Sequence, residues 1–450
     1  MAQRFDLVCI GTGSAASTVA SQCRAAGWSV AIIDKRPFGG ACALRGCDPK
    51  KVLVGGADAV DWTRRMNGKG IADREARIDW PSLMQFKRTF TEPVPQARDN
   101  TFRKAGIATF HGPARFTGAA SVQVGKDVLE AKHVVIAAGM KPGSLGIGGE
   151  NFVTISDQFL ELDSIPPRII FIGGGYISME FAHVAAIAGV KVTIVHRGPR
   201  PLEGFDPDLV AMLVEGVRER GIELHLNAQA ESIEADGKVL RLTVSQGAEK
   251  RYFEAEKIVH GAGRVPEIDD LNLEAAGIEW ERRGVKVNEY LQSVSNPAVY
   301  AAGDAALSGN PPLTPVAGYE GRIVAANLLQ GNREKAQPGV VPTVAFTIPP
   351  LASVGLREEQ ALAAGIRFRK TFNRTEGWYS SRRVGEPHSG FKILIDEATD
   401  QIIGAHLFGH NAEELINLFT IAMQAEIPAA DLRRIMFAYP THGSNVQYML

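Results

Sequence analysis

The chain has few cysteines, no long apolar run and almost no net charge. Only four of its 450 residues are cysteine, and aromatic residues make up 7%. Low cysteine use argues against a disulfide-rich secreted scaffold and is typical of proteins in a reducing compartment. No apolar segment approaches the ~18 residues that indicate a membrane-spanning helix. The formal net charge of −1 gives no reason to expect nucleic acid or a membrane as a partner.

What the chain does have is length, glycine and an ordinary balance of residue types. Its 450 residues are enough for about two to four domains. A hydrophobic fraction of 45% and a charged fraction of 22% are ordinary for a globular protein. An apolar strand pattern begins at residue 5, so we expect no signal peptide and a cytoplasmic location. The 47 glycines suit a protein rich in phosphate-binding turns.

The N-terminal residues have the pattern of a dinucleotide-binding unit. A buried strand pattern at residues 6–10 is followed by the turn GTGSAA at residues 11–16 and a helical pattern. The next strand pattern ends at Asp34, 21 residues after Gly13, where an acid that binds a ribose hydroxyl belongs. Glycines let the backbone approach a pyrophosphate, and the helix N-terminus supplies amide donors. Strand, turn, helix and acid together predict a nucleotide site.

A second unit of the same kind follows in the middle of the chain. A strand pattern at residues 168–172, the turn GGGYIS, a helical pattern over 179–188 and a strand over 191–195 make up this unit. Two dinucleotide sites in one chain imply electron transfer between two cofactors. Arg197 and Arg200 follow the second strand in place of an acid, and arginine suits a 2′-phosphate. This predicts NADPH rather than NADH; a solvated basic loop is the alternative.

Two of the four cysteines, Cys42 and Cys47, lie five residues apart in the segment GGACALRGCDPKK. In a regular helix, residues with this spacing are about 8.6 Å apart, whereas a disulfide needs Cα atoms within roughly 7 Å. A bridge therefore requires a distorted helix start, for which Gly46 gives the backbone room. A strained bridge is easily reduced, so the spacing predicts a redox-active disulfide. The alternative is two reduced cysteines in a helix; no metal site is expected.

This segment resembles the signature of the class I pyridine nucleotide–disulfide oxidoreductases, and the resemblance extends over nearly the whole chain. It implies an α/β fold with two Rossmann-type domains, for FAD and NAD(P), and a C-terminal α+β dimerisation domain. The implied FAD domain is discontinuous, at residues 1–145 and 266–335, with the NAD(P)H domain at 146–265 and the dimerisation domain at 336–450. A homodimer with a composite active site is expected.

The resemblance also assigns site residues. Glu180 matches a glutamate that pairs with a lysine after the cysteines, and the sequence leaves open whether Lys50 or Lys51 is that lysine. A buried lysine–glutamate pair holds positive charge where reduced flavin becomes negative. The expected cofactor-binding residues are Gly11, Gly13, Ser14, Ala15, Asp34, Lys35, Gly40, Ala41, Lys51, Ala138, Gly139, Gly173, Gly175, Tyr176, Ile177, Arg197, Arg200, Gly263, Arg264, Gly303 and Asp304.

The C-terminal end departs from the family pattern. Disulfide reductases of this family carry His-Pro-Thr-x-x-Glu there, whereas this chain has Tyr439 in place of the histidine and Ser444 in place of the glutamate. Tyrosine has an ordinary pKa of about 10, against about 6.5 for histidine, and is the poorer base at neutral pH. His442 is nearby but displaced by three residues. Either Tyr439 or His442 is the candidate for the acid/base role; an ordinary loop histidine is the alternative for His442.

These features predict an FAD-dependent enzyme that passes electrons from NADPH through Cys42 and Cys47 to a disulfide or a similar acceptor. Cys47 is assigned as the flavin-proximal thiol and Cys42 as the thiol that attacks the acceptor. The alternative is a reductase of a quinone, a metal ion or dioxygen, because such acceptors need no protonated leaving thiol. A non-catalytic redox sensor or complex subunit is a third possibility. The sequence does not name the small-molecule acceptor.

Overall fold

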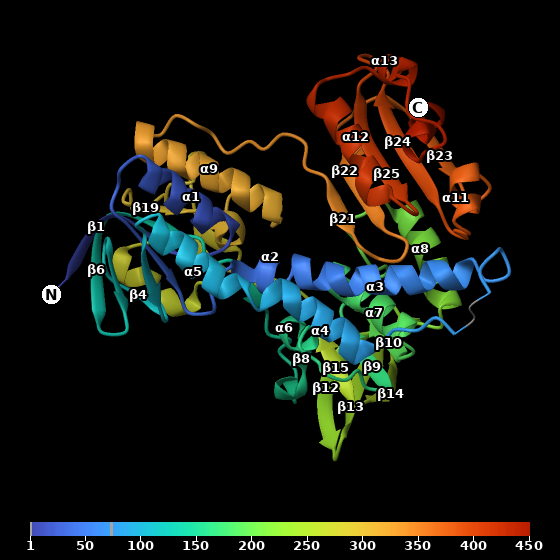
Figure 1. The fold of residues 1–450 in the computed structure, drawn as a ribbon, viewed down its shortest axis with the longest axis horizontal. Helices are drawn as coiled ribbons and strands as arrows, with labels where there is room; N and C mark the ends of the chain where they lie inside the picture. The colour runs from blue at the N-terminus through green and yellow to red at the C-terminus, as the bar shows by residue number, and fades with distance from the viewer. Residues whose placement is uncertain (1, 73–74) are drawn as a thin grey trace. The chain divides into compact units, whose positions relative to one another are not determined.

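The computed structural model describes residues 2–72 and 75–450, which form two compact units (Figure 1). The first unit comprises Met1–Pro49, Lys87–Gly143 and Arg264–Pro338. The second unit comprises Lys50–Phe86, Ser144–Gly263 and Gly339–Leu450. Each unit therefore unites three segments that lie far apart in the sequence.

A seven-stranded sheet forms the centre of the first unit. In spatial order its strands are β3 (Ala108–His111), β2 (Val30–Asp34), β1 (Gln3–Ile10), β6 (Asp127–Ile136), β5 (Ser121–Val124) and β4 (Ala114–Gly118), with β19 (Val299–Ala301) also paired to β6. The pairs of β1 with β2 and β6, of β2 with β3 and of β6 with β19 are parallel. Cys9 lies opposite Ile32 on one side and Val135 on the other, as expected of a buried parallel strand.

Helices and short strands complete the first unit. Its helices are α1 (Ser14–Ala25), α2 (Gly40–Arg45), α5 (Val94–Lys104) and α9 (Thr314–Gln330), and its short strands are β7 (Met140–Pro142), β16 (Arg264–Pro266), β17 (Trp280–Glu281), β18 (Gly284–Lys286) and β20 (Ala306–Leu307). The helices α1 and α9 approach closely, because a Cβ atom on Gly321 would lie 2.8 Å from the Ala15 carbonyl oxygen. Ala16, Val19 and Val324 share the apolar core on this side.

The second unit contains a parallel sheet of five strands. In spatial order these are β11 (Glu223–His225), β10 (Lys191–Val195), β9 (Arg168–Ile172), β15 (Lys257–His260) and β8 (Thr154–Ile155). An antiparallel meander follows it in the chain, made of β12 (Gln229–Asp236), β13 (Val239–Gln246) and β14 (Glu249–Ala255). The helices of this part are α6 (Ser156–Phe159), α7 (Tyr176–Ile187) and α8 (Pro207–Glu219).

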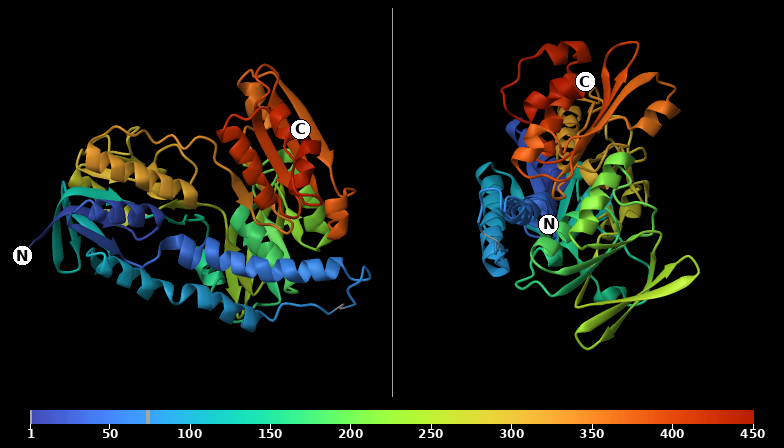
Figure 2. Two further views of the ribbon diagram at one scale, coloured as in Figure 1. Left: turned by 45° about the horizontal axis from the view of Figure 1, so that its top comes forward. Right: turned by 90° about the vertical axis from the view of Figure 1, so that its right-hand side faces the viewer.

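The C-terminal residues of the second unit form an antiparallel sheet with helices packed on it (Figure 2). Its strands, in spatial order, are β21 (Thr343–Ala345), β22 (Leu351–Gly355), β25 (Ile402–Phe408), β24 (Gly390–Asp396) and β23 (Phe368–Arg374). The helices are α10 (Glu358–Ala363), α11 (Tyr379–Arg383), α12 (Ala412–Gln424), α13 (Ala429–Arg434) and α14 (Val446–Met449). Ile416 and Phe419 of α12 share an apolar core with Ile393 and Ala405 of the sheet.

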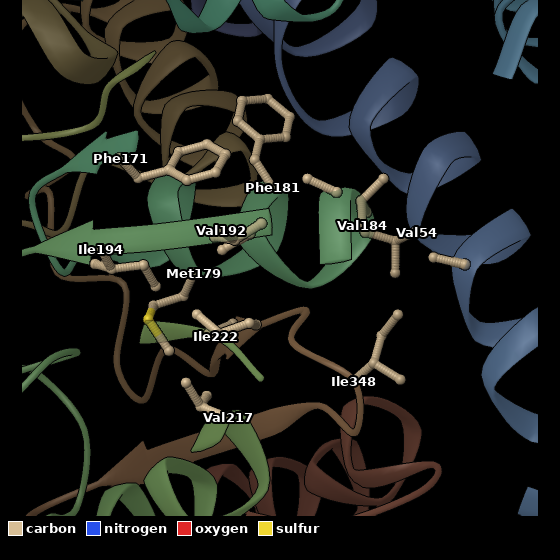
Figure 3. Close-up of a cluster of buried hydrophobic side chains, with 14 of the residues drawn as sticks. Val54, Phe171, Met179, Phe181, Val184, Val192, Ile194, Val217, Ile222 and Ile348 are labelled. Carbon is tan, nitrogen blue, oxygen red and sulfur yellow. The ribbon is translucent and has the colours of Figure 1, made fainter. Parts of the chain in front are cut away.

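One apolar cluster connects the helix that follows the cysteines to the rest of the second unit. This helix, α3, spans Cys47–Arg65, and a further helix, α4, spans Trp80–Thr91. Figure 3 shows Val54 of α3 with Phe181 and Val184 of α7 and with Ile348 of the C-terminal part. The second unit therefore holds α3 through buried apolar contacts.

The fold predicted from the sequence is confirmed as α/β, with two Rossmann-type sheets and an α+β C-terminal part. The strands expected at 168–172 and 191–195 have those bounds, and the helix expected at 179–188 begins three residues earlier, at Tyr176. The predicted domain boundaries, at 145/146, 265/266 and 335/336, stay predictions. Among the described residues, no helix is long and apolar enough to cross a membrane.

Candidate active site

The first glycine turn forms one wall of a cavity in the first unit. The cavity is also lined by the end of β2 and by the turn after β6, and its walls include Gly11, Gly13, Asp34, Ala138 and Gly139. Gly11 has a φ of +109°, and a Cβ atom there would lie 2.2 Å from the carbonyl oxygen of Ala137. Only glycine fits this position without moving the backbone. The turn leads into α1, whose N-terminal amides suit a pyrophosphate.

A second close approach brings the cysteine segment to the same cavity. A Cβ atom on Gly40 would lie 2.5 Å from Gly13 Cα, so these two backbones touch where each residue lacks a side chain. Gly40 and Ala41 line the cavity, as does Arg45, which precedes the second cysteine. The segment that carries the thiols is therefore fixed against the nucleotide turn.

Asp34 is held in place at the end of β2. Its Oδ2 accepts a hydrogen bond from Thr12 Oγ1 at 2.6 Å, and its Oδ1 accepts from the Arg36 amide at 2.9 Å. The Thr12 hydroxyl in turn accepts from the Gly39 amide at 3.1 Å. Thr12 is thus a site residue that the sequence analysis missed, although it lies inside the recognised glycine turn.

The other residues of the first unit that were expected to bind a cofactor lie partly inside and partly outside the cavity lining. Lys35 lines the cavity, with its Nζ 3.0 Å from Asp270 and 3.2 Å from Glu267. Five of the expected residues of this unit are not among those that line this cavity: Ser14, Ala15, Arg264, Gly303 and Asp304. Ser14 and Ala15 begin α1, and the Gly303 amide donates to Glu320 Oε2 at 2.7 Å. Arg264 donates to the Met140 carbonyl, while Gly263 belongs to the second unit.

The two cysteines lie on either side of a helix break. Helix α2 ends at Arg45, Gly46 follows with φ −140° and ψ −112°, and α3 begins at Cys47. Cys42 is half-buried and Cys47 is exposed. Cys47 Sγ is 3.6 Å from Thr314 Oγ1, and the same hydroxyl hydrogen-bonds to Cys42. Thr314, which begins α9, is 267 residues from Cys47 and was missed by the sequence analysis.

The surroundings of Cys42 disfavour its thiolate. Its Sγ donates to Asp48 Oδ1 at 3.8 Å. A hydrogen bond with Cys47, burial and the Asp48 charge all raise the pKa of Cys42 well above its ordinary value, and the Thr314 hydrogen bond opposes them. Cys47 instead begins α3, where helix amides favour a thiolate.

Both candidate lysines contact the expected glutamate in the second unit. Glu180 Oε2 is 2.9 Å from Lys50 Nζ and 2.7 Å from Lys51 Nζ, and its Oε1 accepts from the Phe346 amide at 3.0 Å. Glu180 is 1% exposed. Burial alone would raise the pKa of this carboxyl, but the two ammonium groups lower it below its ordinary value. The sequence treated the lysines as alternatives, whereas the structure pairs both with Glu180.

The second glycine turn repeats the backbone constraint of the first. Gly173 has a φ of +105°, and a Cβ atom there would lie 2.5 Å from the Gly261 carbonyl oxygen. Gly175 caps α7, which begins with the half-exposed Tyr176 and Ile177. The Gly174 amide donates to His196 Nδ1 at 3.0 Å. The backbone of this turn fits a second pyrophosphate.

The two arginines after β10 differ in their contacts. Arg197 is exposed at the end of the strand. Arg200 Nη2 donates to the Glu203 carbonyl at 2.9 Å. His196, between β10 and Arg197, was missed by the sequence analysis because its bond to Gly174 spans 22 residues.

The two C-terminal candidates have opposite environments. Tyr439 is 79% exposed and borders a cavity with Tyr379, Arg383 and Tyr448. His442 packs against the His410 ring, with ring centroids 5.6 Å apart. Burial, aided by His410 and Arg383, lowers the pKa of His442 to about 4. His442 is therefore neutral near pH 7.

Comparison with known proteins decides the family. Residues 5–321 match the pyridine nucleotide-disulphide oxidoreductase family, and residues 341–450 match the dimerisation domain of that family. The chain belongs to this family of pyridine nucleotide–disulfide oxidoreductases. It is therefore an FAD-dependent oxidoreductase that uses NAD(P)H, and its C-terminal residues form a homodimerisation domain.

Relatives of this oxidoreductase differ in their named acceptors. The chain is 31% identical to a mercuric reductase of Bacillus cereus over 448 residues, covering 98% of this chain and 70% of that protein. It is also 31% identical to a glutathione reductase of Burkholderia cepacia, covering 97% and 96%. A solved Cu(II) complex of the HOCl-induced flavoprotein disulfide reductase RclA from Escherichia coli has a TM-score of 0.89 and 26% identity, covering 99% of each chain.

The cavity of the first unit fits the FAD of this family. A glycine turn that a Cβ atom would block, a helix N-terminus and a fixed carboxylate are the groups that a dinucleotide requires. The geometry therefore provides for the pyrophosphate at Gly11 and Gly13 and for a ribose at Asp34.

Proposed function

We propose that this oxidoreductase uses NADPH to reduce a disulfide acceptor through Cys42 and Cys47. The observation that carries the proposal is the position of the two thiols. They flank a helix break, share the Thr314 hydroxyl and belong to the segment that touches the nucleotide turn. FAD, when bound, supplies two-electron transfer between the coenzyme and this thiol pair.

The two cysteines are assigned different roles. Cys42 attacks the acceptor disulfide and forms a mixed disulfide, and one acceptor thiol leaves. Cys47 then attacks Cys42 Sγ, so that the second acceptor thiol leaves and a Cys42–Cys47 bond forms. Thr314 donates a hydrogen bond to whichever sulfur carries negative charge. The position of Cys47 at the start of α3 supports its assignment as the thiolate next to the flavin.

Lys50, Lys51 and Glu180 are assigned an electrostatic role. Two ammonium groups and one carboxylate leave a single net positive charge in a mostly buried cluster. Such a fixed charge stabilises a negative charge that develops during a reaction, and it needs no rearrangement at that moment. We assign this cluster to the reduced flavin, as the family resemblance implies.

Arg197 is assigned to the adenosine 2′-phosphate. It is exposed at the strand end where the first unit carries Asp34, whereas Arg200 already donates to a backbone carbonyl. Arginine binds phosphate through paired, charge-assisted hydrogen bonds. The preference for NADPH rests on this residue.

In the homodimer, Tyr439 is assigned to the active site of the partner subunit. Its exposure leaves the phenol free to donate a hydrogen bond to a leaving thiolate. His442, with its pKa lowered to about 4, is too weak a base to hold a proton near pH 7, as the histidine of a conventional disulfide reductase does. We therefore expect slow reduction of glutathione disulfide. The rate of that reduction should also lack the change near neutral pH that the titration of a histidine would cause.

A metal ion is the second candidate acceptor. The missing acid/base histidine favours it, because reducing a metal ion releases no thiol that must be protonated. Relatives include mercuric reductases and a reductase solved with Cu(II). NADPH oxidation with glutathione disulfide, Cu(II) and Hg(II), measured on the parent and on Tyr439→Phe, separates the candidates. The disulfide proposal expects Tyr439→Phe to slow disulfide turnover only.

Visible spectra test the roles of the cysteines. Cys42→Ser should show a long-wavelength thiolate–flavin charge-transfer band without any reduction, because Cys47 then remains a free thiolate. Cys47→Ser should lack the band even after two-electron reduction. Cys23→Ser is the matched control, since that thiol is fully buried elsewhere in the unit. Indistinguishable spectra for Cys42→Ser and Cys47→Ser would refute the assignment.

A further inference from the structure

Asp48 places a carboxylate directly beside the thiol that attacks the acceptor. It is the acidic residue in the first turn of α3, and its side chain is exposed. Its Oδ1 accepts the hydrogen bond of Cys42 Sγ at 3.8 Å. An acceptor that reaches Cys42 therefore comes within a few ångströms of a negative charge.

Two groups of the same segment act on Cys42 through their negative charge. Cys47 and Asp48 both raise its pKa through their charges. The three cations of the same segment have other positions: Arg45 lines the FAD cavity, and Lys50 and Lys51 both contact Glu180. The Asp48 carboxylate, 3.8 Å from the Cys42 sulfur, contributes a negative potential there, and this potential acts on the charge of any bound acceptor.

A purely structural role for Asp48 makes a different prediction. An acid in the first turn of a helix is stabilised by the helix dipole, typically to a modest extent. Loss of that interaction lowers the stability of α3. It does not change how the enzyme ranks acceptors that differ only in charge.

We propose that Asp48 is a specificity-determining residue that makes Cys42 favour acceptors with positive charge beside their S–S bond. The proposal rests on the assignment of Cys42 as the attacking thiol. The reaction is balanced: two thiols, Cys42 and Cys47, become one disulfide, and the acceptor disulfide becomes two thiols that take up the two protons. Two electrons from NADPH restore the dithiol. Asp48 contributes no electrons or protons; it attracts a cationic acceptor and repels an anionic one.

Three small disulfides of matched length test the proposal by turnover. These are cystamine, which is cationic, 2-hydroxyethyl disulfide, which is neutral, and 3,3′-dithiodipropionate, which is anionic. For the parent enzyme we expect kcat/KM to fall in that order. Asp48→Asn should lower the cystamine-to-dithiodipropionate ratio about tenfold at low salt. Asp48→Glu should keep the ratio, and added salt should lower the ratio in the parent and in Asp48→Glu but leave it nearly unchanged in Asp48→Asn.

Glu281→Gln is the matched control, because it removes one negative charge from the exposed strand β17 of the same unit. It should leave the ratio unchanged. A parent enzyme that turns over all three disulfides equally, through Cys42, would overturn the charge proposal alone. Disulfide turnover that survives Cys42→Ser would instead overturn the proposed function.

Single-turnover labelling provides a test that needs no catalysis. In a Cys47→Ser background, Cys42 is the accessible thiol, since Cys9 and Cys23 are fully buried. The rate constants for a cationic and an anionic methanethiosulfonate reagent give a second charge ratio. Adding Asp48→Asn should lower that ratio about tenfold as well. An unchanged ratio would show that Asp48 exerts no charge selection at Cys42.

Discussion

The two glycine turns have the same backbone and different surroundings. Gly11 and Gly173 have φ values of +109° and +105°, and a Cβ atom on either would collide with a carbonyl oxygen of the next parallel strand's turn. Both turns lead into a helix whose N-cap is a glycine, Gly13 or Gly175, without a side-chain cap. The shared geometry accounts for the pyrophosphate and carries no information about which dinucleotide binds.

The difference lies at the end of the strand that follows each glycine turn and its helix, which is β2 for the first turn and β10 for the second. Asp34 is held by the hydroxyl of Thr12, whereas the matching His196 is held by the amide of Gly174. A carboxylate accepts from ribose hydroxyls, whereas the end of β10 carries His196 and Arg197, with Glu203 Oε1 3.4 Å from His196 Nε2. We therefore propose that the end of β10 decides the choice of coenzyme, while each turn supplies only the common part of the site.

The largest expected effect comes from filling the first turn. Gly11→Ala places a methyl group 2.2 Å from the Ala137 oxygen and should weaken FAD binding by about 3 kcal/mol or more. Gly173→Ala should keep the FAD and lose reduction by NADPH instead. FAD content by absorbance and stopped-flow reduction by NADPH measure the two effects.

The control for both variants is Gly27→Ala. Gly27 also has a positive φ, of +93°, but a Cβ atom there would meet no other atom within 4 Å. It should lose some stability without losing either cofactor. If Gly11→Ala retains full FAD, the turn does not hold the pyrophosphate.

The next effect tests the charge of Glu180, which α7 carries and α1 lacks at the matching position. Glu180 of α7 matches Thr18 of α1, which only donates to the Ser14 carbonyl. Glu180→Gln removes the carboxylate charge that both Lys50 and Lys51 contact and should lower the free energy of unfolding by about 3 kcal/mol. Thr18→Val should change it by less than about 1 kcal/mol, measured by urea unfolding.

The pH dependence of that stability has a defined sign. Because the pKa of Glu180 is lower in the folded protein than in the unfolded chain, its contribution is present above about pH 4.5 and lost as the pH falls further. The parent should therefore lose stability on acidification more steeply than Glu180→Gln. Parallel stability curves for the two proteins below that pH would contradict the ion-pair account.

A smaller effect is expected for coenzyme choice. Charge-assisted hydrogen bonds from Arg197 are worth about 1.5–3 kcal/mol, which is roughly a ten- to hundredfold preference for NADPH. Arg197→Glu should abolish or reverse the ratio of kcat/KM for NADPH to that for NADH. Arg251→Glu, on the exposed strand β14 of the same unit, should leave it unchanged. Equal efficiencies in the parent enzyme would refute the role of Arg197.

The smallest expected effect concerns the acid of the first unit. Asp34→Asn keeps a hydrogen-bonding side chain but removes its charge, and should weaken FAD binding by about 1 kcal/mol, or roughly fivefold. Asp127→Asn, at the other end of the unit's sheet on β6, should have no such effect. The FAD dissociation constant, from fluorescence titration of the apoprotein, measures both. An Asp34→Asn variant with parental affinity would show that the ribose contact lies elsewhere.

Local pattern accounts for the parts of the site that lie within one strand–turn–helix unit. Gly11 and Asp34 belong to one such unit, and Gly173 to the other, so spacing alone predicted the turns and the acid. Thr12 lies in the same unit, but only the distance from its hydroxyl to Asp34 identifies its role. The sequence left the choice between Lys50 and Lys51 open for a related reason, because helix spacing does not exclude that two successive ammonium groups converge on one carboxylate.

Several contacts join residues too distant for any pattern. Thr314 reaches Cys47 across 267 residues, and the Phe346 amide reaches Glu180 across 166. Such pairs form only when helices and strands from separate segments pack together. Hydrophobic periodicity fixes which face of an element is buried, but not which distant polar group meets it.

The sequence by itself determined the α/β fold, the two glycine turns, the spaced cysteine pair and the replacement of histidine by Tyr439. Each of these depends on backbone sterics or on residue identity within a short segment. Only the tertiary structure decided that Thr314 serves both sulfurs, that both lysines bind Glu180 and that Asp48 faces Cys42. These are distances between side chains, and they follow from packing and from the helix break at Gly46 rather than from the order of residues.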